Sequence, residues 1–84
     1  MNYTVVWKRE AEDELAEFWM MATDRQAVAD AAYSLERALG DHPLSTGESR
    51  NATTRVAFDG PLGAFYEVSD ADRLVTILKV IRAR

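Results

Sequence analysis

The spacing of apolar side chains changes between residues 7 and 9. Residues 3–7 are rich in β-branched and aromatic types, with Tyr3, Val5 and Trp7 on one face, which predicts a strand. Over residues 9–22, apolar side chains recur every three or four positions, which predicts an amphipathic helix. We expect solvent to cover the acidic face of that helix, which is formed by Glu10, Glu12, Asp13, Glu14 and Glu17.

A second helical pattern follows a short polar break. Asp24 is a good N-cap residue, and apolar side chains then repeat at helical spacing as far as Leu39. Gly40 predicts the end of this helix. Because the break is short, we expect the two helices to form an antiparallel hairpin.

The second half of the chain alternates short apolar runs with turn residues. A polar connection over residues 41–54 precedes runs over 55–58, 64–68 and 74–82, which predict an antiparallel meander. The last run is apolar on both faces, as is typical of an interior strand covered on two sides. Residues 1–84 are therefore expected to form a single two-layer α+β domain in the order β-α-α-β-β-β, with the helical hairpin packed on a small, mainly antiparallel sheet.

The composition favours a small globular protein of the cytoplasm. Hydrophobic residues make up 48% of the 84 residues, and there is no cysteine, which favours a reducing compartment. No apolar run approaches the roughly 20 residues that cross a bilayer, so we expect no membrane contact. The net charge of −4 argues against a general nucleic-acid binder. One His without Cys cannot supply a zinc site, and we expect no metal or cofactor.

The remaining candidate chemistry is a group of basic side chains in the second half, namely Arg50, Arg55, Lys79, Arg82 and Arg84. If the meander brings Arg55 to the end of the last strand, these side chains would converge on one surface and hold a phosphate. Alternatively, they pair with acids at the sheet edge, such as Glu48 or Glu67. His42 follows a helix end and is more typical of a cap than of a general base.

Simple alternation assigns the basic residues of the last strand to its two faces. It places Lys79 with Ile77 and Ile81, and it places Arg82 with Leu78 and Val80. Two helices can cover only one side of the sheet, so the other face needs a partner or stays partly exposed.

The whole chain resembles the RelE/ParE superfamily, the plasmid-stabilisation-type toxins of bacterial type II toxin–antitoxin systems. The resemblance rests on short segments spread along the chain: Tyr3-Thr-Val-Val-Trp with the helix after it, Gly40-Asp-His-Pro-Leu, Gly47-Glu-Ser-Arg, Arg55-Val-Ala-Phe, Phe65-Tyr-Glu-Val and Leu78-Lys-Val-Ile-Arg. It implies the two-layer RelE/ParE fold over nearly all of the chain.

The resemblance implies one of two activities. RelE-like toxins are metal-independent endoribonucleases (mRNA interferases) that cut messenger RNA on the ribosome, whereas ParE-like toxins inhibit DNA gyrase. In the nuclease case, the phosphate contacts would be Arg50, Arg55, Lys79 and Arg82, and Glu48 or His42 would move protons. In both branches an antitoxin segment wraps the sheet and helices, which is the partner that the resemblance implies.

The chain departs from the nuclease pattern in two places. Gly63-Ala64 stands where such toxins carry an arginine, and Arg82-Ala83-Arg84 stands where many carry Tyr or His. A second hypothesis therefore remains open: a non-catalytic interaction module, a degenerate toxin homologue whose sheet face binds a peptide or a second copy of the chain as a homodimer.

Overall fold

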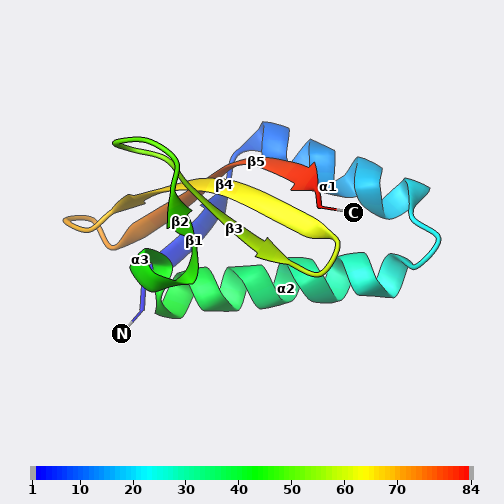
Figure 1. Cartoon of the computed structure of the whole chain (residues 1–84), viewed down its shortest axis with the longest axis horizontal. Helices are drawn as coiled ribbons and strands as arrows, with labels where there is room; N and C mark the ends of the chain where they lie inside the picture. The colour runs from blue at the N-terminus through cyan, green and yellow to red at the C-terminus, as the bar shows by residue number, and fades with distance from the viewer. Residues whose placement is uncertain (1, 84) are drawn as a thin grey trace.

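The computed structural model describes residues 2–83, in which five strands form one sheet with the helices packed against it (Figure 1). Arg84 lies outside the described residues. The elements in chain order are β1 Thr4–Trp7, α1 Arg9–Met21, α2 Arg25–Asp41, α3 Pro43–Thr46, β2 Glu48–Ser49, β3 Arg55–Asp59, β4 Leu62–Ser69 and β5 Leu74–Arg82. None of the helices in residues 2–83 has the length and apolar character needed to cross a membrane.

The strand order is β1-β5-β4-β3-β2. β3, β4 and β5 pair antiparallel, so the predicted meander is confirmed. β1 pairs parallel with β5, which makes β5 an interior strand, as its two apolar faces predicted. The fold is therefore the expected α+β arrangement with a mixed, mainly antiparallel sheet.

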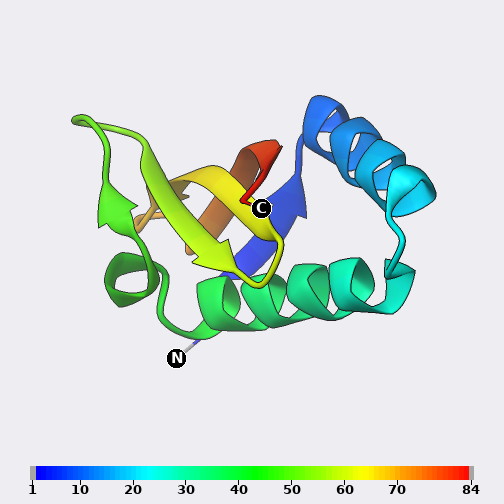
Figure 2. The ribbon, with the colours of Figure 1, turned by 45° about the vertical axis from the view of Figure 1, so that its right-hand side comes forward.

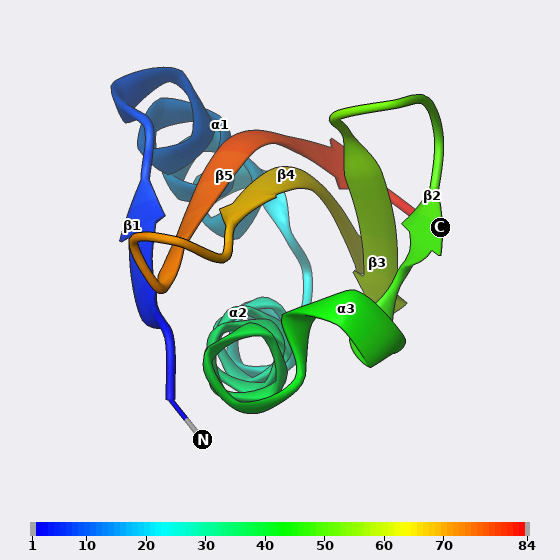
Figure 3. The same ribbon diagram turned by 90° about the vertical axis from the view of Figure 1, so that its left-hand side faces the viewer.

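The sheet curves around α2, which lies against its concave face (Figure 3). α1 runs antiparallel to α2 and lies beside β5, so the predicted helical hairpin is confirmed (Figures 1 and 2). The core forms where α2 meets the sheet, with Leu35 and Leu39 buried against Leu62, Tyr66 and Ile77. Burial of side chains of this size contributes about 1.5–3 kcal/mol each, which makes this contact the main source of stability.

The turn between the helices is fixed by side-chain caps. The Asp24 carboxylate accepts a 3.0 Å hydrogen bond from the Ala27 N–H, which confirms the predicted N-cap. Arg25 donates to the carbonyls of Trp19 (3.1 Å) and Met20 (2.9 Å) and lies over the Trp19 ring. These bonds satisfy the last carbonyls of α1 and set the angle at which α2 leaves it.

The second helix does not end at Gly40, as the sequence predicted, but continues to Asp41. Gly40 lies inside the helix, where its carbonyl accepts a 2.7 Å hydrogen bond from the Tyr3 N–H, and a Cβ there would make only ordinary van der Waals contacts with Tyr3 and Val5. Pro43 accounts for the actual end of the helix, since a proline disfavours helical geometry in the residue before it.

The polar connection after α2 is more structured than predicted, because it contains α3 and β2. The Tyr66 hydroxyl donates to the Pro43 carbonyl (2.7 Å), and Arg55 donates to the carbonyls of Leu44 (2.8 Å) and Gly47 (2.7 Å). A Cβ at Gly47 would lie 2.7 Å from the Tyr66 hydroxyl, so only glycine allows this approach. The segment is thus attached to the sheet by polar groups of β3 and β4.

A β-bulge interrupts the pairing of β4 with β5. Phe65 of β4 lies opposite Lys79, but the next residue of β4 lies opposite Ile77, which leaves Leu78 as the extra residue. As a result Ile77 and Val80 are both buried, although they are three positions apart. The prediction that Lys79 shares a face with Ile77 is therefore wrong, because the bulge reverses the alternation between them.

Candidate functional site

The side of the sheet that points away from α2, here called the open face, carries part of the predicted site. Cross-strand neighbours form a row across it, from Glu48 through Val56 and Phe65 to Lys79. Directly paired residues project on the same side of a sheet, so these side chains share the open face. α1 flanks this face on one side, and the loop between β2 and β3 flanks it on the other (Figure 3).

The middle of the open face is apolar. The Phe58 ring lies over Gly63, because a Cβ at Gly63 would be 2.7 Å from Phe58 Cε1 and 3.0 Å from Ile81 Cγ1. Phe58 is 62% exposed, and Phe65 and Ile81 are partly exposed beside it. The glycine that stands in place of the nuclease arginine therefore leaves room for an aromatic side chain on this face.

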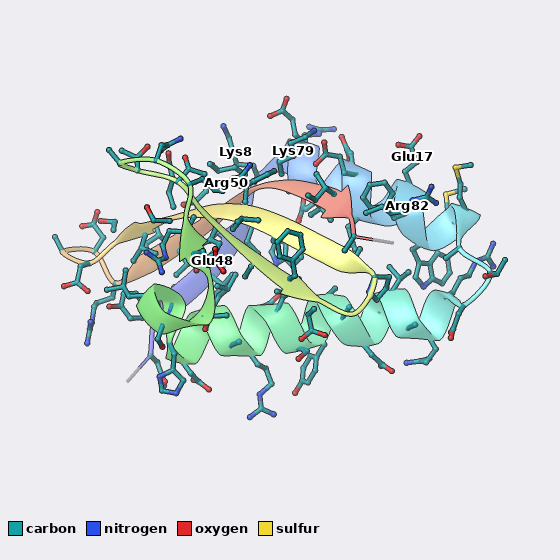
Figure 4. All side chains as sticks on the ribbon, in the orientation of Figure 1. Lys8, Glu17, Glu48, Arg50, Lys79 and Arg82 are labelled. Atoms are coloured by element: carbon teal, nitrogen blue, oxygen red, sulfur yellow. The ribbon has the colours of Figure 1, made fainter. Side chains whose placement is uncertain are left out.

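Two of the predicted basic residues lie on either side of Phe65. The Arg50 guanidinium carbon is 6.0 Å from the centroid of the Phe65 ring, and Lys79 is the cross-strand neighbour of Phe65. Figure 4 shows Arg50 and Lys79 on the same side of the sheet. The Asn51 side chain accepts from the N–H groups of Thr53 (3.0 Å) and Thr54 (2.9 Å), which orders the loop that begins at Arg50.

Glu14 of α1 holds Lys79 in an ion pair. Its Oε2 lies 2.7 Å from Lys79 Nζ, and its Oε1 accepts a 2.8 Å hydrogen bond from the Val80 N–H. β1 pairs with β5 only as far as Ile77, and the Glu14 carboxylate bonds to β5 beyond that point. The prediction of a solvated acidic face is wrong for Glu14, whose side chain is only 26% exposed.

The ion pair shifts the pKa of both groups. Burial raises the pKa of the Glu14 carboxyl, but the hydrogen bonds from Lys79 and the Val80 N–H outweigh burial and leave that pKa lowered. The hydrogen bond to Glu14, followed by its negative charge, raises the pKa of Lys79. Both shifts favour the charged forms, so the pair stays ionised at neutral pH.

Arg55 is not on the open face. It lies opposite Tyr66, which is fully buried on the side of the sheet that faces the helices. Its guanidinium donates to the carbonyls of Leu44 and Gly47, and its Nε lies 3.4 Å from the Tyr66 hydroxyl oxygen. Two of its three nitrogens, Nε and Nη2, are therefore bound to backbone and side-chain oxygens of the chain itself.

Arg82 and His42 also lie away from the open face. Arg82 pairs with the buried Leu62 and lines a hollow beside Phe18 of α1, so it projects toward the helices. Arg55 lies opposite Tyr66 in the middle of β4, whereas Arg82 lies opposite Leu62 at its start, so the expected convergence of Arg55 with the end of the last strand does not occur. His42 is exposed at the junction of α2 and α3, where its carbonyl accepts from the Thr46 hydroxyl at 2.5 Å. Of the six predicted side chains, the structure thus brings Arg50 and Lys79 together beside Phe65, while Glu48 stands two strands away at the far end of the row.

Sequence reasoning missed Glu14 and the aromatic residues of the open face. The sequence does contain a signal for Glu14, which is three residues after Ala11 and four before Phe18, on the apolar stripe of α1. For Phe58 no comparable signal exists, because its position depends on the empty space at Gly63 of the neighbouring strand.

A second apolar surface lies between the two long helices. It is a groove of about 620 Å³ whose lining includes Leu15, Trp19 and Tyr33. The Trp7 ring N–H donates to Glu36 at 2.9 Å at this surface. The groove is separated from the open face by the sheet and α1.

No known family profile matches the sequence, and no curated protein matches it significantly. Solved structures do match over 98% of the chain. They include the toxin–antitoxin complex RelBE2 from Mycobacterium tuberculosis, with 24% identity, 92% of that chain covered and a TM-score of 0.82. The chromosomal ParDE toxin–antitoxin system of P. aeruginosa matches with 15% identity, 97% coverage of that chain and a TM-score of 0.73. The isolated E. coli RelE toxin matches with 16% identity, 85% coverage and a TM-score of 0.64.

Proposed function

Because the chain has the fold of the RelE/ParE toxins, we propose that it is the toxin of a bacterial type II toxin–antitoxin pair. The proposal has two parts, an antitoxin segment that covers the chain and a cellular target on which the free toxin acts. The likeness to structures of toxin–antitoxin systems supports the first part, and the chemistry of the open face supports the second.

An antitoxin segment would find two apolar surfaces on this chain. One is the open face with Phe58 and Phe65, and the other is the groove between α1 and α2 with Trp19 and Tyr33. Exposed apolar surfaces of this kind on a small protein are typical of interaction sites. A segment that wraps the chain would cover both and keep the target out.

We favour a protein target, DNA gyrase, over RNA. The observation that carries this choice is that, of the predicted cations within residues 2–83, only Arg50 and Lys79 share the open face, and the Glu14 carboxylate neutralises Lys79. Phosphate cleavage builds charge that several convergent donors must stabilise. An apolar surface with two cations outside any ion pair of the described residues on its side of the sheet, Arg50 and Lys8 (Figure 4), suits a protein partner better than a phosphate chain.

Cleavage of messenger RNA is the second candidate, and one arrangement favours it. Arg50 and Lys79 flank the Phe65 ring, on which a base could stack while the cations contact the phosphates. The 2′-hydroxyl would lose its proton to Glu48 and attack the adjacent phosphorus. The bond from that phosphorus to the 5′-oxygen would break, and the 5′-oxygen would take its proton from water. Arg55, Arg82 and His42 take no part in this candidate, because they lie elsewhere.

The test is induced expression in a bacterial host, with and without the neighbouring reading frame. We expect growth to stop and the neighbouring product to restore it, and we expect purified protein to inhibit supercoiling by gyrase while messages stay intact. Cutting of ribosome-bound message with gyrase unaffected would replace the first candidate by the second. Growth that continues normally would leave only the non-catalytic interaction module.

A matched pair of variants tests whether growth inhibition depends on the open face. Phe58→Ser removes an exposed aromatic side chain from the open face, and Leu44→Ser removes an exposed apolar side chain from α3. We expect Phe58→Ser to relieve growth inhibition and Leu44→Ser to leave it unchanged. Equal effects of the two variants would place the target surface elsewhere.

A further inference from the structure

Glu14 links α1 to the open face by both of its carboxylate oxygens. One oxygen lies 2.7 Å from Lys79 Nζ, and the other accepts from the Val80 N–H at 2.8 Å. The backbone bond holds the carboxylate in place, so Lys79 cannot move toward a ligand without leaving a fixed partner. An ion pair anchored in this way is less easily broken than a pair of two mobile side chains.

This contact removes one positive charge from the surroundings of Phe65. Arg50 lies over Phe65, Lys79 is its cross-strand neighbour, and Lys8 lies on the same side of the sheet (Figure 4). Glu14 bonds to Lys79, whereas Glu48 stands at the far end of the row. Glu10, also on α1, adds a weaker negative field at Lys79. Without the Glu14 charge, Lys79 would add a free cation to Arg50 and Lys8 on this side of the sheet.

We propose that Glu14 is a specificity residue that cancels the charge of Lys79 and so directs the open face away from polyanions and toward a protein partner. The inference rests on the proposed function only in treating the open face as the binding surface. Affinity for a polyanion depends on the number of cations free to contact phosphates. Glu14 removes one such cation from the face, while the apolar contact area of Phe58 and Phe65 remains available.

Glu14→Gln removes the negative charge of residue 14 but keeps its structural role. The amide oxygen of glutamine can still accept from the Val80 N–H, so α1 keeps its attachment to β5. Glu17→Gln is the matched control, because it removes the same charge from the same helix at a residue outside the ion pair (Figure 4). Circular dichroism and urea unfolding of each variant verify that it is folded.

The experiment measures binding of a fluorescein-labelled single-stranded RNA dodecamer to the purified full chain by fluorescence anisotropy. We expect Glu14→Gln to bind about fivefold tighter than wild type at low salt, the size of one exposed ion pair. The slope of log K against log salt should steepen by about 0.7, the value for one more phosphate contact on a single strand. Lys79→Gln in the Glu14→Gln background should reverse both effects, and Glu17→Gln should behave as wild type.

A comparison with the wild-type chain gives a second, independent test. Because Glu14 already neutralises Lys79, removing both charges together in the Glu14→Gln/Lys79→Gln double variant should leave wild-type RNA affinity, whereas Arg50→Gln should weaken it. Equal losses for these two variants would overturn the proposal, as would unchanged binding by folded Glu14→Gln or an equal gain for Glu17→Gln. None of these outcomes depends on growth or gyrase, so failure here is distinct from failure of the toxin assignment.

Discussion

The Tyr66 hydroxyl donates a 2.7 Å hydrogen bond to the backbone carbonyl of Pro43, and both residues are buried. This bond joins the middle of β4 to the start of α3. Arg55 adds bonds from β3 to the same segment. The segment leads directly into β2 and the loop that carries Arg50, so one side of the open face depends on this network.

Tyr66→Phe removes the hydroxyl and leaves the Pro43 carbonyl without its donor. A buried acceptor that loses its partner costs about 1–3 kcal/mol, so we expect the free energy of unfolding to fall by roughly that amount in urea titrations. Tyr33→Phe is the control, because Tyr33 is 65% exposed and should unfold at the wild-type urea concentration. Equal urea midpoints for all three proteins would show that the bond contributes nothing.

Arg55→Ala tests whether Arg55 is structural. The substitution leaves the Leu44 and Gly47 carbonyls without their charged donor, and we expect a loss of roughly 1.5–3 kcal/mol in the free energy of unfolding. Amide hydrogen exchange over residues 43–49 should accelerate as well. Arg50→Ala, at an exposed position, should stay within about 0.5 kcal/mol of wild type. If Arg55→Ala is as stable as wild type, Arg55 would again be a candidate for ligand binding.

The Glu14–Lys79 pair predicts a defined dependence of stability on pH. The folded-state pKa of Glu14 is lowered from its ordinary 4.5, so its contribution is present above about pH 4.5 and is lost as the pH falls through the folded value. Lys79 has a raised pKa, so its contribution is present below its ordinary 10.5 and is lost as the pH rises through the folded value. Between these limits both contributions are intact.

Urea unfolding of wild type and Glu14→Gln at several pH values measures the loss of stability in acid. We expect wild type to be the more stable protein near pH 7, and we expect the difference to shrink steadily below about pH 4.5. Glu17→Gln should not show this narrowing. A wild-type advantage that stays constant from pH 7 to strongly acidic solution would mean that the Glu14 charge does not contribute to stability.

Local sequence patterns were sufficient to predict the two long helices, the Asp24 cap and the meander, because neighbouring residues determine each of these features. These patterns did not predict features that depend on contacts between distant segments. The bulge at Leu78 arises from the pairing of β5 with β4, and no feature of β5 alone specifies it. It reverses the faces of the strand and moves Lys79 to the side opposite Ile77.

The candidate site was predicted less well than the fold for the same physical reason. Arg55 is suited to phosphate binding by residue type, yet its donors are taken by the carbonyls of Leu44 and Gly47, which come from a different segment. Lys79 lies on the last strand, as predicted, but its partner Glu14 lies 65 residues earlier. Charge pairing across such distances depends on the packing of α1 against the sheet.

The most direct test of the account is a supercoiling assay with DNA gyrase and the purified chain, combined with mapping of message ends in cells that express it. The account predicts that the chain inhibits supercoiling, that the product of the neighbouring reading frame restores it, and that messages stay intact. Normal supercoiling together with messages cut at the ribosome would contradict the assignment of a protein target to the open face.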